Sequence, residues 1–230
     1  YDAWQYIQSL YSQSSIQISN KSTIGFGLRI QRNKIGIGDV LETNAPDYGG
    51  WQTQHLKFSD HELNYAFNLG MDHKVNQMIN LYGRIGNGFR YPNIDDRIGG
   101  SGGTSFELDT QKTNDLEIGG NFTKKKFYTN ISYYLIDGKH ELGYDSDSFE
   151  NININSTRRH GIEIDSKFKF SDKLNFKNSF SFTKAKYTDG NQGSYATNFR
   201  DRDIPLVPQY SLDSSLEWSI FEKTNLEFSM

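Results

Sequence analysis

Strict alternation of apolar and polar residues, sustained over unusually long runs, is the feature that most restricts how this chain can fold. In the run 174–182, one parity holds Leu174, Phe176, Phe180 and Phe182, whereas the other holds Asn, Lys and Ser. The runs 23–30, 62–71, 79–85, 162–170 and 212–220 alternate in the same way. Apolar residues at every second position would wind around a helix but line one face of a strand. The sequence therefore predicts β-strands with one apolar face each.

The predicted strands are long. Their full-length members run for about 11 to 15 residues, whereas a globular strand has about 5–6 and a tilted membrane-crossing strand needs about 9–11. This length favours a membrane wall over a soluble sheet. The ten predicted strands lie at 4–14, 22–32, 59–71, 77–90, 113–123, 127–140, 156–170, 174–188, 209–219 and 225–230.

The connections between these strands alternate in length. Short polar turns are expected near 20–21, 72–74, 124–126, 171–173 and 222–224, and long loops near 33–58, 91–112, 141–155 and 189–208. Outer-membrane barrels have short turns on the periplasmic side and long loops outside. Aromatic residues at strand ends also suit the two interfacial girdles of such a barrel, although strand ends of a soluble sheet can carry them too; they are Trp4, Tyr6, Phe89, Tyr91, Tyr187, Tyr210 and Trp218.

Composition excludes several other classes of protein. Sixteen Phe and 14 Tyr argue against disorder, and the absence of cysteine excludes disulfides, thiolate metal sites and a cysteine nucleophile. Acidic and basic residues are interspersed at a net charge of −3, so no nucleic-acid partner is expected. No stretch approaches 18 consecutive apolar residues, and mean hydropathy is −0.72. A β-barrel tolerates this polar average because it needs apolar residues only at alternate positions.

Five segments, in order over about 130 residues, carry a family resemblance. Residues 82–92 resemble a glycine-spaced strand end with Phe-Arg-x-Pro, and residues 108–119 resemble Leu-x-Pro-Glu-x-Ser/Thr followed by Glu-x-Gly, with Thr110 and Gln111 in place of Pro-Glu. Residues 133–137, 160–164 and 204–208 match the strands and loop end that follow. Together they resemble the C-terminal β-barrel of TonB-dependent outer-membrane receptors.

The resemblance implies an all-β fold: a transmembrane antiparallel up-and-down β-barrel, of which this chain supplies about ten strands out of about 22. We expect residues 1–230 to be a partial barrel domain without plug domain or TonB box, because neither end resembles a natural start or stop. The implied function is import of a scarce nutrient such as siderophore-bound iron, haem or cobalamin through a Gram-negative outer membrane. The implied partners are outer-membrane lipid, the protein's own plug, a TonB-type energising complex and the small ligand, with no cofactor and no enzymatic activity.

Two long loops hold the candidate ligand-binding residues. Arg90, Tyr91 and Arg97 lie in one loop, and Tyr195, Arg200 and Arg202 lie in another. Arginine at an outward-facing mouth can hold an anionic ligand through forked hydrogen bonds. Salt bridges between loops and contact with lipopolysaccharide remain alternatives for the same residues.

No catalytic or metal-binding arrangement emerges from the other polar residues. The five histidines are scattered, and the acidic loop residues Asp145, Asp147 and Glu150 form either a weak cation site or a solvated loop. A glycine fingerprint for nucleotides at Gly83–Gly88 is rejected because no helix follows it. Instead we expect Gly83, Gly86 and Gly88 to mark a bulge or close backbone approach, and Pro92 to end its strand.

Charged residues within the strands test the membrane hypothesis. A charge facing lipid at mid-bilayer costs about 2–4 kcal/mol, so the charges must face the lumen; they are Arg84, Glu117, Glu163, Asp165, Lys167 and Lys169. Three alternatives stay open. A soluble ligand-binding or adhesin sandwich would have shorter strands and a second packed layer, an outer-membrane hydrolase would need a Ser/His pair, and a non-TonB porin would lack the ordered motifs.

Overall fold

The computed structural model describes residues 2–38, 57–97, 108–145, 150–154, 156–189, 200–221 and 224–230. Ten strands form one antiparallel sheet in the order β1-β2-β3-β4-β5-β6-β9-β10-β11-β12. Their bounds are β1 Asp2–Ser19, β2 Ser22–Gly38, β3 Lys57–Lys74, β4 Ile79–Arg90, β5 Gln111–Lys124, β6 Phe127–Lys139, β9 Thr157–Lys169, β10 Leu174–Tyr187, β11 Tyr210–Phe221 and β12 Thr224–Ser229. All ten predicted strands are thus confirmed.

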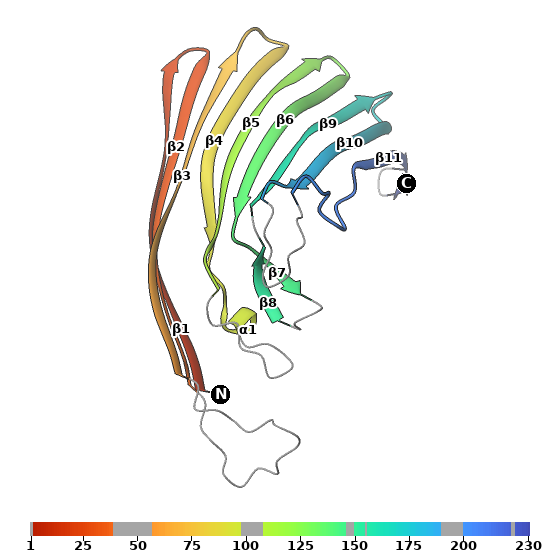
Figure 1. Ribbon diagram of the computed structural model, residues 1–230. Helices are drawn as coiled ribbons and strands as arrows, with labels where there is room; N and C mark the ends of the chain where they lie inside the picture. The colour runs from red at the N-terminus through yellow and green to blue at the C-terminus, as the bar shows by residue number, and fades with distance from the viewer. Residues whose placement is uncertain are drawn as a thin grey trace.

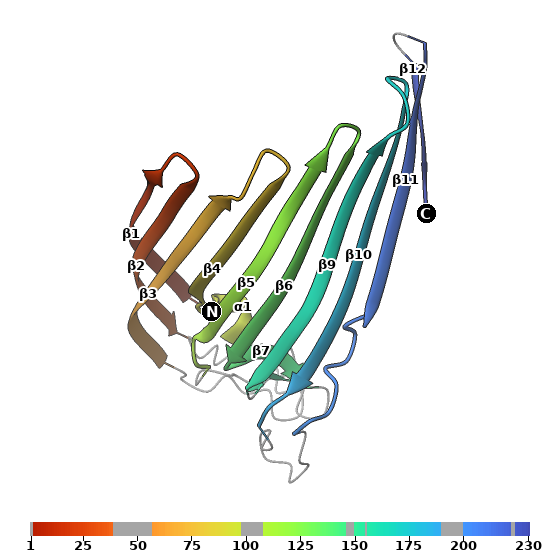
Figure 2. The same cartoon turned by 90° about the horizontal axis from the view of Figure 1, so that it is seen from above.

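The sheet curves into an open trough (Figure 1). Short turns gather at one end of the strands, and helix α1 and strands β7 and β8, which belong to the longer connections, lie at the other end (Figures 1 and 2). The edge strands β1 and β12 are not joined to each other in this chain. The arrangement is the predicted up-and-down wall of a larger barrel, with the predicted asymmetry of its connections.

Two of the connections contain structure that the sequence did not indicate. Residues expected to form a plain loop hold the hairpin β7 Glu141–Asp145 and β8 Glu150–Ile154, and the loop after β4 holds the short helix α1 Ile94–Arg97. Both lie on the concave side of the sheet (Figure 1). In addition, β1, β2 and β3 have 18, 17 and 18 residues, longer than predicted. The extension of β2 includes Ile35 and Ile37, which are buried on the concave face.

One face of the sheet is apolar and fully uncovered. Directly opposite residues share a face, so the register joins Ile131 to Ile164, Ile164 to Phe180, and Phe180 to Leu212 in one row. Ile131 remains 50% exposed and Leu212 57% exposed. No second sheet packs against this face within the described residues, so the sandwich alternative is wrong.

A polar row interrupts this apolar face. Thr129, Ser166, Asn178 and Ser214 are successive cross-strand partners on β6, β9, β10 and β11. They are hydrogen-bonded in pairs, with 3.0 Å between the Thr129 and Ser166 hydroxyls and 2.8 Å from Ser214 Oγ to Asn178 Oδ1. Mutual pairing lowers the cost of placing these groups on an apolar surface.

The opposite face is concave and polar. The register places all six predicted lumenal charges on it, which confirms that prediction: Arg84 pairs with Glu117, and Glu163, Asp165, Lys167 and Lys169 alternate with the apolar residues of β9. Arg84 and Glu117 also form an ion pair. A hydrogen-bonded ladder continues from Glu117, since Tyr82 donates to it at 3.2 Å and Asn130 donates to the Tyr82 hydroxyl at 3.1 Å.

Two glycines of the family-like motifs are explained by tyrosines on the concave face. Gly119 lies directly opposite Tyr82, and a Cβ there would approach the tyrosine ring to 2.6 Å. Gly161 lies opposite Tyr134, and a Cβ there would collide with the Phe182 carbonyl oxygen and approach the Tyr134 hydroxyl to 2.8 Å. Each glycine leaves room for an aromatic ring to lie across its strand.

The close approach predicted around Gly86 is also present. A Cβ on Gly86 would lie 2.8 Å from the Phe67 carbonyl oxygen, and β3–β4 pairing stops at the Asn68–Gly86 pair. The Asn87 side chain then replaces the ladder, accepting from the Phe67 amide at 2.7 Å and donating to the Tyr65 carbonyl at 3.0 Å. The strand itself ends at Arg90, two residues before Pro92, as expected. Among the described residues no helix is long and apolar enough to span a membrane.

Candidate functional site

The candidate residues of the first loop lie at the long-loop end of the trough. Arg90 is the last residue of β4, and its guanidinium binds Asp96 of α1 at 3.0 Å. Asn93 and Asp96 cap the helix reciprocally, because the Asp96 amide donates to Asn93 Oδ1 at 2.6 Å and the Asn93 amide donates to Asp96 Oδ2 at 2.9 Å. The arginine and the cap together hold this connection in one folded conformation.

Tyr91 and Arg97 anchor the same connection to the inner face of β2 and β3. The Tyr91 hydroxyl donates to the Gln31 carbonyl at 2.7 Å. Arg97 is 1% exposed and lies over the Phe58 ring, 4.9 Å from its centre. Both side chains are therefore occupied by the protein itself in this conformation, and the structure gives them an anchoring role that the sequence did not reveal.

Burial shifts the pKa of both Arg97 and Tyr91. Burial lowers the pKa of Arg97, and the carboxylates of Asp60 and Glu62 oppose that shift. Burial likewise raises the pKa of Tyr91, which keeps its hydroxyl a donor at neutral pH. An acidic environment around a buried guanidinium is the expected compensation for the loss of hydration.

The hairpin β7–β8 is anchored at a second point. Arg159 of β9 forms a two-pronged ion pair with Glu141 of β7, and Thr157 also donates to that carboxylate. Burial alone would raise the pKa of Glu141, but the hydrogen bonds from Arg159 and Thr157 outweigh it and lower the pKa below its ordinary value. Further contact to the first loop comes from Asn151, which donates to the Asp96 carbonyl at 2.8 Å. The two connections therefore form one packed assembly over the trough.

The second candidate loop is described only in part. Arg200 and Arg202 are exposed beside the outer end of β10, where the Tyr187 amide donates to the Arg202 carbonyl at 3.0 Å. Tyr195 lies outside the described residues. The structure thus brings Arg90, Tyr91 and Arg97 together, and places Arg200 and Arg202 at the same end of the sheet on a different connection.

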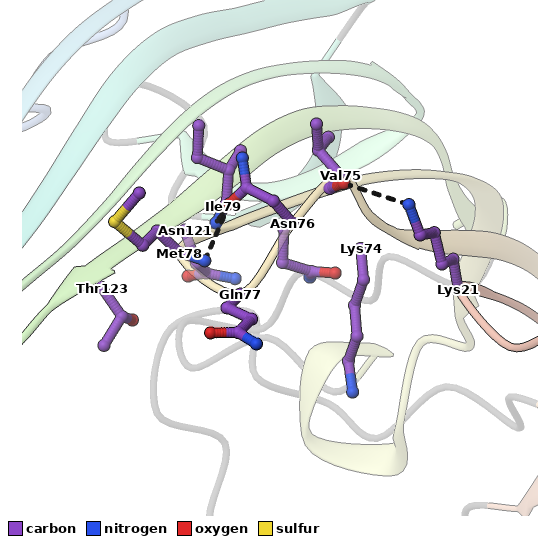
Figure 3. Close-up of a pocket in the computed structure, with 10 residues that line it drawn as sticks. Lys21, Lys74, Val75, Asn76, Gln77, Met78, Ile79, Asn121 and Thr123 are labelled. Atoms are coloured by element: carbon purple, nitrogen blue, oxygen red, sulfur yellow. Dashed lines mark hydrogen bonds between the residues drawn. The ribbon is translucent and has the colours of Figure 1, made fainter.

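A hollow at the short-turn end was not foreseen from the sequence. It has a cavity volume of about 610 Å³, and Figure 3 shows the side chains that line it, among them Lys21, Lys74 and Asn121. The turn beside it is fixed by Asn76, whose Oδ1 accepts from the Met78 and Ile79 amides at 2.8 and 3.0 Å. The hollow combines the ammonium groups of Lys21 and Lys74 with an apolar lining that includes Val75, Met78 and Ile79.

Metal-binding groups are not assembled in the part of the chain that the structure describes, where no cluster of three or more His, Asp or Glu side chains has metal-ligand geometry. His140 instead lies 2.8 Å from Asp109. Of the acidic loop considered as a cation site, Asp145 and Glu150 are opposite residues of the β7–β8 hairpin, and Asp147 lies outside the described residues.

The comparisons with known proteins agree with this geometry. A family profile described as "TonB dependent receptor-like, beta-barrel" matches residues 1–228. No curated protein sequence is similar enough to count as a match. Among solved structures, the copper transporter OprC superposes with a TM-score of 0.73 at 15% identity, covering 94% of this chain and 33% of that one.

Two receptors whose names refer to ferric compounds also superpose on this chain. The ferric yersiniabactin uptake receptor FyuA from Yersinia pestis has a TM-score of 0.73 at 15% identity, with 98% of this chain and 33% of that chain covered. The ferric-catecholate import receptor Fiu from E. coli K12 has a TM-score of 0.69 at 14% identity, with 99% and 34% covered. This chain thus spans about a third of the length of each of these proteins.

Proposed function

The chain belongs to the TonB-dependent receptor β-barrel family, and from that premise we propose that it forms part of the wall of a receptor that imports a scarce nutrient. Its strands lie in the outer membrane of a Gram-negative bacterium. The observation that carries the proposal is the family match over residues 1–228, on a sheet with an apolar convex face and a charged concave face. A mainly polar and charged lumen lining suits a wall that surrounds water and protein rather than lipid.

The concave face is proposed to receive the protein's own plug domain. Its charges and amides need hydrated or polar neighbours, and Lys21 and Lys74 add two ammonium groups around a hollow near the short-turn end. A TonB-type energising complex would act on that plug from the periplasmic side. A passive porin shares the wall but not the family match.

The ligand is proposed to bind at the long-loop end. Arg200 and Arg202 are exposed there, so they are the residues of the candidate set best placed to touch an anionic ligand, together with Tyr195 of the same connection. Arg90, Tyr91 and Arg97 contribute by holding the first loop in place. The names of the similar structures favour siderophore-bound iron or copper over haem or cobalamin as cargo.

Growth and uptake measurements test the proposal. A strain lacking the full-length receptor is offered ferric siderophores, haem, cobalamin or limiting copper as the sole source of each nutrient. We expect loss of uptake for one of them, restored by the wild-type gene but not when the energising complex is inactivated. Uptake that persists without the energising complex would identify a passive pore instead.

Substitutions at the long-loop end test where the ligand binds. The double variant R200A/R202A is expected to weaken ligand binding, since each charge-assisted hydrogen bond contributes about 1.5–3 kcal/mol. Lys173→Ala, at the short-turn end, is the matched control and should leave binding unchanged. Equal binding by both variants would remove Arg200 and Arg202 from the site.

A further inference from the structure

On the neighbouring strands β5, β6, β9 and β10, three pairs of basic residues lie directly opposite each other on the outward, apolar-bearing side of the sheet; a fourth such pair, Lys34 and His61, lies apart from them on β2 and β3. Lys112 pairs with Lys139 across β5 and β6. On β9 and β10, Arg158 pairs with Lys186 and His160 pairs with Lys184. Like charges at opposite positions repel and destabilise a sheet unless an anion lies between them. We call these six residues the outward basic cluster.

The protein itself neutralises only part of the cluster. Arg158 binds Asp137 at 2.6 Å, and Lys186 lies 3.9 Å from Asp203. Lys112, Lys139 and Lys184 have no ion-pair partner among the described residues. On the described part of the outward face the acidic strand residues are Asp137 and Asp2, and Asp2 lies on the distant edge strand β1. The cluster therefore carries an excess of positive charge.

The cluster lies directly beyond the apolar belt, on the long-loop side. From the long-loop end toward the membrane, the outward residues of β10 are Lys186, Lys184, Phe182 and Phe180 in that order. On β9 they are Arg158, His160 and Ile162. This order places the cluster at the level of the outer-leaflet headgroups. Its four strands are neighbours in the sheet, so it is about 14 Å wide at a strand spacing of about 4.8 Å.

We propose that the outward basic cluster binds the phosphate groups of an outer-leaflet lipid. A phosphate lying between opposed lysines supplies the anion that each like-charged pair needs. A lipid source is favoured over free phosphate because the cluster adjoins the apolar surface on which acyl chains lie. Lysine side chains are suited to this level, since their stems cover apolar surface while the ammonium groups reach the headgroups.

Lipid retention by the full-length receptor tests the proposal. Purified receptor is exchanged into detergent, and lipid A in its diphosphorylated and dephosphorylated forms is titrated while bound lipid is counted by native mass spectrometry. The variant K112Q/K139Q/K184Q/K186Q removes four charges from the cluster. The matched control, K124Q/K125Q/K167Q/K173Q, removes four exposed lysine charges from the turns and the concave face.

The wild type and the control should bind diphosphorylated lipid A at least about tenfold more tightly than the cluster variant, because each basic residue near a lipid surface contributes about 1 kcal/mol. They should also prefer the diphosphorylated form to the dephosphorylated form by about tenfold, a comparison that needs no variant. Equal binding of both lipid forms by the wild type would overturn the proposal. Displacement of bound lipid by millimolar inorganic phosphate alone would overturn the lipid source.

Discussion

Two adjacent residues of β10 allow the two faces of the wall to be compared directly. Phe180 lies on the outward face between Ile164 and Leu212, and Ser179 lies on the concave face between Asp165 and Asp213. Replacing each in turn by arginine introduces the same side chain at almost the same height in the membrane. The two substitutions therefore place the same charge on opposite faces, and Phe180→Arg in addition removes an apolar side chain from the lipid-facing side.

The expected costs follow from these neighbours. An arginine facing lipid costs about 2–4 kcal/mol at the midplane and about 0–1 near the interfaces. Phe180 lies two residues from the centre of the outward stretch 174–182, so we expect Phe180→Arg to cost about 2 kcal/mol, or roughly 30-fold in the folding equilibrium. Ser179→Arg instead gains two carboxylate neighbours, and its effect should lie between zero and a stabilisation of about 1 kcal/mol.

Urea titrations of the full-length receptor folded into phosphatidylcholine vesicles measure both effects. The folded fraction can be followed by the altered gel mobility of unheated samples. The reasoning is refuted if Ser179→Arg destabilises the protein as much as Phe180→Arg, because the two faces would then not differ in solvent.

Two further predictions concern backbone approach and pH. Gly86→Ala should destabilise the wall by about 1–3 kcal/mol, because the new Cβ would lie 2.8 Å from the Phe67 carbonyl oxygen, whereas Gly83→Ala has its nearest contact at 3.6 Å and should be tolerated in the same urea titration; equal losses would contradict this. Because the folded pKa of Glu141 is lowered from its ordinary 4.5, its carboxylate should stabilise the β7–β8 hairpin above that pH and lose this effect as the pH falls through the folded value. The amide protection factors of residues 141–145 and 150–154, which correct for the intrinsic pH dependence of exchange, should therefore fall on acidification in the wild type and already be low at neutral pH in Glu141→Gln, and a pH profile shared by both would argue against it.

The strands could be predicted from the sequence because contact with lipid restricts the residue type at alternate positions within each strand. A residue such as Ile164 or Phe180 must be apolar whatever its partner is, and its neighbours Asp165 and Ser179 must not face lipid. The alternation therefore appears within a single strand and needs no knowledge of the fold. The same reasoning placed the six lumenal charges on the correct face.

The contacts at the long-loop end of the trough could not be predicted in this way, because they join residues that are far apart in the sequence. The Tyr91 hydroxyl meets a carbonyl 60 residues away, and Asn151 meets one 55 residues away. Nothing near Tyr91 or Arg97 in the sequence distinguishes an anchor from a ligand contact. Gly119 was similarly ambiguous, because its role depends on the register that sets Tyr82 opposite it.

The central claim, that lipid contacts one parity of these strands and water the other, can be tested by spin-label accessibility along β9. This chain has no cysteine, so single cysteines at 162 to 167 can be introduced into the full-length receptor, with any cysteine outside this chain replaced, and labelled one at a time after reconstitution. We predict that molecular oxygen, which concentrates in lipid, reaches labels at Ile162, Ile164 and Ser166, and that a water-soluble nickel complex reaches labels at Glu163, Asp165 and Lys167 unless the plug covers them. Oxygen accessibility without a two-residue period, or highest at the charged positions, would contradict the account.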